Sequence, residues 1–163
     1  MYKLVLIIAM MSVWITAHSI QIEQEMALKT VYLAKQAINR AAHAAAQQLD
    51  SSALSEGELR IDEEQAKEVA MLYLQRNLHL NSQGEPLPAS FLQNPVKLLV
   101  FDIVNAEQSF PYHYVNTAYQ YEVWLERPAV IIIGNIIYPQ MFRTISSIDW
   151  TLKGTAQMTY FND

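Results

Sequence analysis

Nineteen consecutive residues near the N-terminus, residues 4–22, include no Asp, Glu, Lys or Arg. Folded as a helix, they would rise about 28 Å, which is close to the hydrocarbon thickness of a lipid bilayer. Lys3 precedes this stretch, and Glu23 and Glu25 follow it. Positive charge ahead of a span favours a cytoplasmic N-terminus. The sequence therefore predicts a single-pass anchor in the cell membrane at residues 1–22, with the rest of the chain on the extracytoplasmic side.

Two other interpretations of the same stretch stay open. A cleaved signal peptide has an apolar core of similar length, and Ala17 could occupy a cleavage position. Ile15 is a poor residue two positions before such a site, however, and the first Gly or Pro of the chain is Gly57. A helix buried inside a soluble protein is the third interpretation. A retained anchor is favoured because the helical apolar spacing continues past residue 22 without a break.

The residues after the anchor predict a continuation of the same helix over residues 23–50. They are rich in Ala and other strong helix formers. Apolar residues recur at steps of three and four, which places them on one stripe: Ala27, Val31, Ala34, Ile38, Ala41, Ala45 and Leu49. We therefore expect one helix, about 70 Å long, through anchor and stripe. The small side chains of Ala41, Ala42 and Ala45 would let another helix or a sheet approach closely, so we expect them at a partner interface.

The whole of residues 23–163 is expected to form a small α+β domain. Asp62 with Gln65 three residues later resembles a capping box, so a second, shorter helix is predicted over residues 62–79. Strands are then predicted within residues 96–161, where alternation of apolar and polar residues replaces helical spacing. The strand segments are 96–104, 119–126, 129–138 and 150–160. Their short connections predict an antiparallel sheet of about four strands.

One of these segments permits two arrangements. Residues 129–138 are rich in β-branched residues and too short to span a membrane as a helix, so a central strand is favoured. Gly134 and Asn135 stand inside it. They could mark a bulge, or they could split the segment into a tight hairpin.

The composition excludes several kinds of chemistry. The chain has no Cys, so it cannot form a disulfide or a zinc–cysteine site. Its formal net charge is −5, and its basic residues are not clustered, which argues against nucleic acid as a partner. No recognised catalytic or phosphate-binding motif is present, and the histidines are far apart in sequence. We therefore expect no metal, no cofactor and no enzymatic activity; a hydrolase would need a triad that nothing in the sequence indicates.

Aromatic residues concentrate in the second half of the chain. Tyr112, Tyr114 and Trp124 are predicted to contribute to a partner interface, because Tyr and Trp bury area at low entropic cost. Two other interpretations of these aromatic residues stay open: they could pack within the core, or they could form an ordered loop over the sheet edge. A pocket in which they surround His113 would instead indicate a ligand-binding or sensor domain. Asp102 interrupts an apolar run and is expected at an edge or facing solvent.

The layout of the N-terminal third resembles that of a known group of proteins. Residues 35–49 read KQAINRAAHAAAQQL and follow the uncharged stretch without a break. A short cytoplasmic start, one span, an Ala-rich helix and then an antiparallel sheet is similar to type IV pilin-like proteins. Residues 35–49 also look like the post-membrane helix of TadE-type pilus-assembly pseudopilins. The resemblance covers residues 3–50 by motif and the remainder by layout.

The resemblance implies an extracytoplasmic structural or assembly component of a pilus or secretion apparatus. Its expected partners are the lipid bilayer and other membrane or pilus-assembly proteins, or further copies of itself. The chain departs from the pilin pattern in two respects, since no Gly precedes the span and no Glu stands near its start. These departures favour a minor or anchoring component over a polymerising subunit. A membrane-anchored ligand-binding or sensor domain without catalysis is the alternative.

Overall fold

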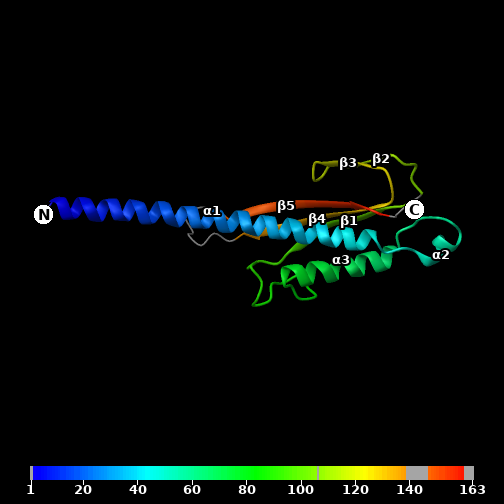
Figure 1. The fold of residues 1–163 in the computed structure, drawn as a ribbon, viewed down its shortest axis with the longest axis horizontal. Helices are drawn as coiled ribbons and strands as arrows, with labels where there is room; N and C mark the ends of the chain where they lie inside the picture. Colours follow the sequence, from blue (N-terminus) through cyan, green and yellow to red (C-terminus); the bar gives the residue numbers. More distant parts are fainter. Residues whose placement is uncertain (1, 106, 139–146, 160–163) are drawn as a thin grey trace.

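The computed structural model describes residues 2–105, 107–138 and 147–159, and it shows an α+β fold built along one long helix (Figure 1). The helices are α1 (Tyr2–Ala46), α2 (Ser51–Ser55) and α3 (Glu63–Leu78). The strands are β1 (Lys97–Val104), β2 (Tyr112–Asn116), β3 (Tyr121–Leu125), β4 (Ala129–Tyr138) and β5 (Ile148–Gln157). The long N-terminal helix, the shorter second helix and the antiparallel sheet expected from the sequence are confirmed.

The first helix is continuous over 45 residues, as its uninterrupted helical spacing predicted. It is about 68 Å long, and its N-terminal half projects from the rest of the protein as a bare rod (Figure 1). The expected end near residue 50 is wrong, because α1 stops at Ala46. The Asp50 side chain instead accepts hydrogen bonds from the backbone N–H groups of Ser52 and Ala53, which starts the short, unpredicted α2.

The second predicted helix begins where its cap residue indicated. The Asp62 carboxylate accepts a hydrogen bond of 2.9 Å from the Gln65 backbone N–H. Glu63 and Glu64 in the first turn suit the positive end of the helix dipole. The helix ends at Leu78, and the following residue, His79, adopts a left-handed conformation with φ of 52°.

The strands form two sheets rather than a single sheet of about four strands. A three-stranded sheet has the order β1-β4-β5, and β2 pairs with β3 as a separate hairpin; all pairs are antiparallel. The segment from Tyr112 was expected to be a loop, but it is strand β2. Of the two arrangements left open at Gly134, the tight hairpin is wrong, because β4 is unbroken. The irregularity lies in the facing strand, between Leu98 and Val100. Residues 160 and 161, the end of the last predicted strand region, lie outside the described residues.

Strand β4 is central, with one apolar layer on each side of it. Val130, Ile132 and Ile136 pack with the buried face of α1 and with α3. Ala129 and Ile131 belong to a second apolar cluster beneath the β2–β3 hairpin, together with Tyr114 and Leu125. Because both faces are covered, β4 is apolar at nearly every position instead of alternating.

Close approach between α1 and the sheet depends on small residues at the contact. Ala37, Ala41 and Ala45 of α1 are buried in the core that α1 forms with the sheet and α3. A Cβ atom at Gly154 of β5 would lie 2.6 Å from the Ile38 Cγ2 atom and 3.1 Å from the Asn39 Oδ1 atom. No side chain fits at such a distance, so Gly154 sets how closely the helix can lie on the last strand.

We therefore expect Gly154→Val to destabilise the protein by about 1–3 kcal/mol, because the added atoms force α1 away from β5. The free energy of unfolding of the full chain in detergent, measured by urea denaturation, checks this. Thr151→Val, at an exposed position on the same strand, is the matched control and should change stability by less than about 0.5 kcal/mol. Equal stability of the two variants would contradict the close contact.

Candidate functional site

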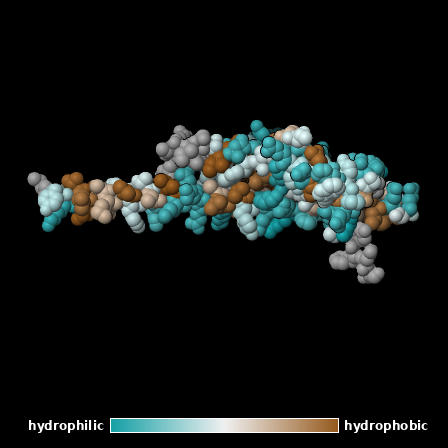
Figure 2. All heavy atoms as spheres, turned by 90° about the horizontal axis from the view of Figure 1, so that it is seen from above, coloured by the Kyte–Doolittle hydropathy of each residue, from teal (hydrophilic) through white to brown (hydrophobic). Residues whose placement is uncertain are grey.

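Among the residues that the structure describes, none covers the apolar N-terminal part of α1. Residues 2–18 are all exposed, and the most apolar 18-residue window of the helix has no buried residue. Figure 2 shows this segment as a largely hydrophobic projection from a more polar body. By length and composition, it is long and apolar enough to cross a membrane.

The Ser and Thr hydroxyl groups of residues 4–22 donate hydrogen bonds to the helix itself. Ser12 donates to the Ile8 carbonyl at 2.9 Å, Thr16 to the Ser12 carbonyl at 2.8 Å, and Ser19 to the Ile15 carbonyl at 2.9 Å. A hydroxyl bonded to the carbonyl four residues earlier does not need water as a partner. These side chains are therefore compatible with a hydrocarbon surrounding.

The alanines predicted to meet a partner are used inside the chain. Ala41, Ala42 and Ala45 have no exposed surface, because they lie in the core that α1 forms with α3 and the sheet. The expectation that they form an external interface is therefore wrong for this fold. Their small size allows close internal packing, and a bulky replacement would disturb folding before it disturbed any association.

The predicted aromatic residues divide between the two faces of the hairpin. Tyr114 is only 8% exposed and points toward the sheet, and Tyr112 is half-buried on the same side. Trp124 is 63% exposed on the opposite side, where its ring stacks on that of His113 with 4.4 Å between centroids. Successive side chains of a strand point to opposite faces, so His113 and Trp124 cannot share a pocket with Tyr112 and Tyr114. The alternative of a pocket around His113 is therefore wrong.

Asp102 lies on β1, an outer strand of the sheet, so its expected edge position is confirmed; it is half-buried beneath the hairpin and does not face solvent freely. It accepts a 2.5 Å hydrogen bond from the Tyr114 hydroxyl. Burial and the adjacent carboxylate raise the pKa of Tyr114 to about 12. The pair fixes the hairpin over β1, and it is a packing contact that the alternation of residues 96–104 did not reveal.

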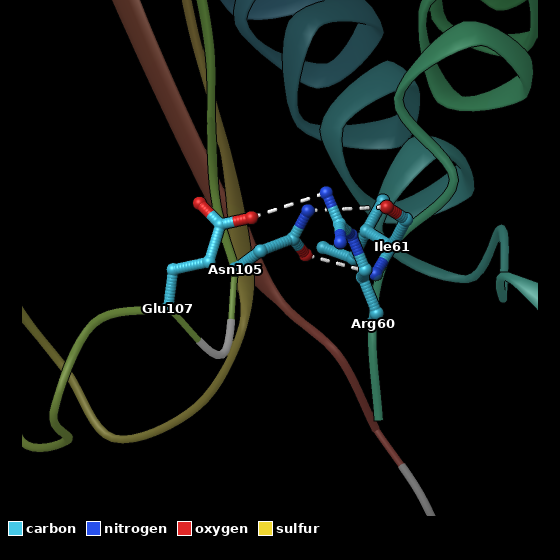
Figure 3. Close-up of polar contacts among 4 residues, drawn as sticks. All are labelled: Arg60, Ile61, Asn105 and Glu107. Carbon is cyan, nitrogen blue, oxygen red and sulfur yellow. Dashed lines mark hydrogen bonds and ion pairs between the residues drawn. The ribbon is translucent and has the colours of Figure 1, made fainter. Parts of the chain in front are cut away.

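A buried amide joins the two halves of the domain (Figure 3). The Asn105 side chain accepts a hydrogen bond of 2.8 Å from the Ile61 backbone N–H and donates one of 3.1 Å to the Ile61 carbonyl. Asn105 is 5% exposed and follows β1, whereas Ile61 precedes α3. An ion pair of 3.1 Å between Arg60 and Glu107 lies beside this contact in solvent.

We expect Asn105→Ala to destabilise the protein by about 1–3 kcal/mol, because both polar groups of Ile61 would be buried without partners. Urea denaturation of the full chain in detergent measures the loss. Glu107→Gln, which weakens the neighbouring exposed ion pair, should cost less than about 1 kcal/mol. A larger loss from Glu107→Gln than from Asn105→Ala would show that the ion pair, not the amide, holds the two halves together.

Each outer strand of the three-stranded sheet borders an open groove. The acidic groove, of about 660 Å³, lies between β1 and the start of α3. Its charged lining residues are Glu63, Glu64, Lys67, Asp102 and Glu107. The basic groove, of about 810 Å³, lies between β5, α1 and the hairpin. It is lined by Lys35, Lys153 and His43 and by no carboxylate among the described residues.

The two lysines of the basic groove are close to each other. The Lys35 ammonium donates to the Lys153 carbonyl, and the Lys153 ammonium donates to the Gln120 carbonyl at 3.0 Å. Burial, and then the positive charge of Lys153, lower the pKa of Lys35. Two like charges thus share a groove in which the described residues place no acidic partner, and sequence reasoning missed this because the residues lie 118 positions apart.

Metal binding has no visible basis in the part of the chain that the structure describes. Within residues 2–105, 107–138 and 147–159, no three His, Asp or Glu side chains are grouped so as to hold a metal ion. No protein-family model matches the chain, and neither does a curated protein or a solved structure. The resemblance to TadE-like pseudopilins accordingly stays a prediction from sequence.

Proposed function

We propose that this chain is a membrane-anchored, extracytoplasmic structural component of an assembly such as a pilus or secretion apparatus, with a pseudopilin-like layout. One observation carries the proposal. A bare apolar segment and the helix that supports the sheet belong to the same unbroken α1. The anchor would therefore hold the domain at a fixed height and direction above the bilayer.

A retained span accounts for the surface of α1 better than a buried helix does. A helix buried in a soluble protein would have its apolar residues covered, whereas the most apolar window of α1 is not buried within the chain. Lys3 before the span and Glu23 and Glu25 after it favour a cytoplasmic N-terminus. The continuous helix through residue 22 favours retention over cleavage near Ala17.

The surface of the domain also bears on the proposal, because it is what partners would contact. The sensor alternative required a pocket that the hairpin does not form, because His113 and Tyr114 face opposite ways. What the domain presents instead is an exposed Trp124, two charged grooves and a continuous connection to the apolar N-terminal part of α1. These features suit a protein that holds its position and contacts neighbours.

The proposal predicts that the mature protein keeps residues 1–22 and stays in the membrane fraction after carbonate extraction. Intact mass measures retention, and protease treatment of spheroplasts should digest the C-terminal domain from outside. Val13→Arg places a charge near the middle of the span, where it costs about 2.5–3.5 kcal/mol of insertion free energy, so membrane recovery should fall.

Tyr32→Arg is the matched control, because it replaces an exposed apolar residue of α1 beyond the span. It should leave membrane recovery unchanged. A mature chain that begins near His18 and is recovered in the soluble fraction would overturn the anchor. Equal effects of the two substitutions would show that residues 4–22 are not the part of α1 that lies in the bilayer.

A further inference from the structure

The two outer strands of the three-stranded sheet are available for pairing. β1 and β5 each bond to β4 on one side, and among the described residues no other strand pairs with their outer sides. An exposed strand edge is a template for another strand, so proteins usually protect such edges with charge or cover. Here each open edge borders one of the two grooves described above.

The two edge strands run in the same direction, and their grooves lie at the same level along β4. Both β1 and β5 are antiparallel to β4, so they are parallel to each other. Ile131 of β4 faces Asp102 on one side and Thr155 on the other. The acidic groove beside Asp102 therefore lies level with the basic groove beside Thr155.

The equal level of the two grooves matters because the proposed anchor would hold every copy at the same height in the membrane. Copies held in one bilayer share the same direction, so β5 of one copy and β1 of the next would lie side by side as parallel strands. The acidic groove has four carboxylates and one lysine, whereas the basic groove has two lysines and a histidine. We propose that the basic groove along β5 binds the acidic groove along β1 of a second copy of this chain, so that the sheets join edge to edge.

This proposal rests on the proposed function, because only a shared membrane fixes the direction and height of the copies. The contact joins two different surfaces, so each copy keeps a free edge of either kind and a row can extend. The opposite pairing of two like edges would place like charges against each other, which is unfavourable.

Lys35 protects the open edge of β5 from pairing with unrelated strands. Its ammonium donates to the Lys153 carbonyl, at the edge where an incoming strand would pair. A lysine in this position discourages unrelated strands. A neighbouring acidic edge offers Lys35 a carboxylate instead, and this also relieves its repulsion from Lys153, the same repulsion that helps to lower the pKa of Lys35. The β5 edge is therefore available for pairing when the partner supplies a carboxylate for Lys35.

The absence of Cys from the chain allows a direct test with an introduced pair. Lys97 of β1 and Thr151 of β5 are both exposed, and both lie opposite Asn135 of β4. Within one copy, β4 separates them by about 10 Å, which is too far for a disulfide. In the full-length chain in membranes, K97C/T151C should therefore form a ladder of disulfide-linked oligomers on mild oxidation. Val115→Cys, exposed on the outer face of the hairpin, measures crosslinking by random collision.

Charge variants in the K97C/T151C background test the cause of the contact. Lys153→Glu or Glu64→Lys alone should lower the crosslinked fraction several-fold, and mixing the two variants should restore it, because each supplies the edge that the other lacks. Glu122→Lys changes a carboxylate that lines neither groove and should have no effect.

Each outcome distinguishes this inference from the anchor. Chain recovered in the membrane fraction with crosslinking no greater than that of Val115→Cys overturns the edge contact and leaves the anchor standing. Efficient dimers from T151C alone would show a β5–β5 contact and would also overturn it. Chain recovered only in the soluble fraction overturns the proposed function. A ladder that depends on Lys153 and Glu64 supports the edge contact.

Discussion

Close packing of α1 on the sheet is the contact on which the other features depend. Alanines on the helix and Gly154 on β5 let the two backbones approach, and Ile38 fills the space at their centre. Apolar burial of this kind contributes about 25 cal/mol per Å² of surface removed from water. The contact uses only the C-terminal half of the helix, because the sheet and α3 extend no further. The N-terminal half is exposed and apolar, and under the proposed function a bilayer would surround it.

Rigidity follows from the same contact. An isolated helix derives little stability from its own sequence, so most helices in proteins are held by the elements that pack on them. In this protein one half would be held by the domain and the other by lipid, with no Gly or Pro between them to introduce a bend. Under the proposed function, one helix would thus connect the membrane to the domain without a separate linker.

The sequence predicted the helices and strands better than it predicted which surfaces pack against them. Uninterrupted helical spacing indicated α1, and Asp62 indicated the start of α3, because both signals are local. The small size of Ala41 and Ala45 correctly predicted a close contact, but periodicity cannot tell whether the surface that covers a stripe comes from the same chain. Tyr112 and Tyr114, two residues apart, would have been placed on one face and His113 on the other if the segment had been recognised as a strand. The grooves depend on residues such as Lys35 and Lys153, which only the fold brings together.

One distance tests most directly whether membrane span and domain share a single rigid helix. Spin labels at Val13 and His43, both exposed and introduced through cysteines that the chain otherwise lacks, report it in lipid nanodiscs. Dilution with unlabelled chain removes signals between copies. A continuous helix predicts a narrow distance distribution centred near about 45 Å, from 1.5 Å of rise per residue. A broad distribution, or one centred well below that value, would mean that α1 bends or breaks between the bilayer and the sheet, and would contradict the account.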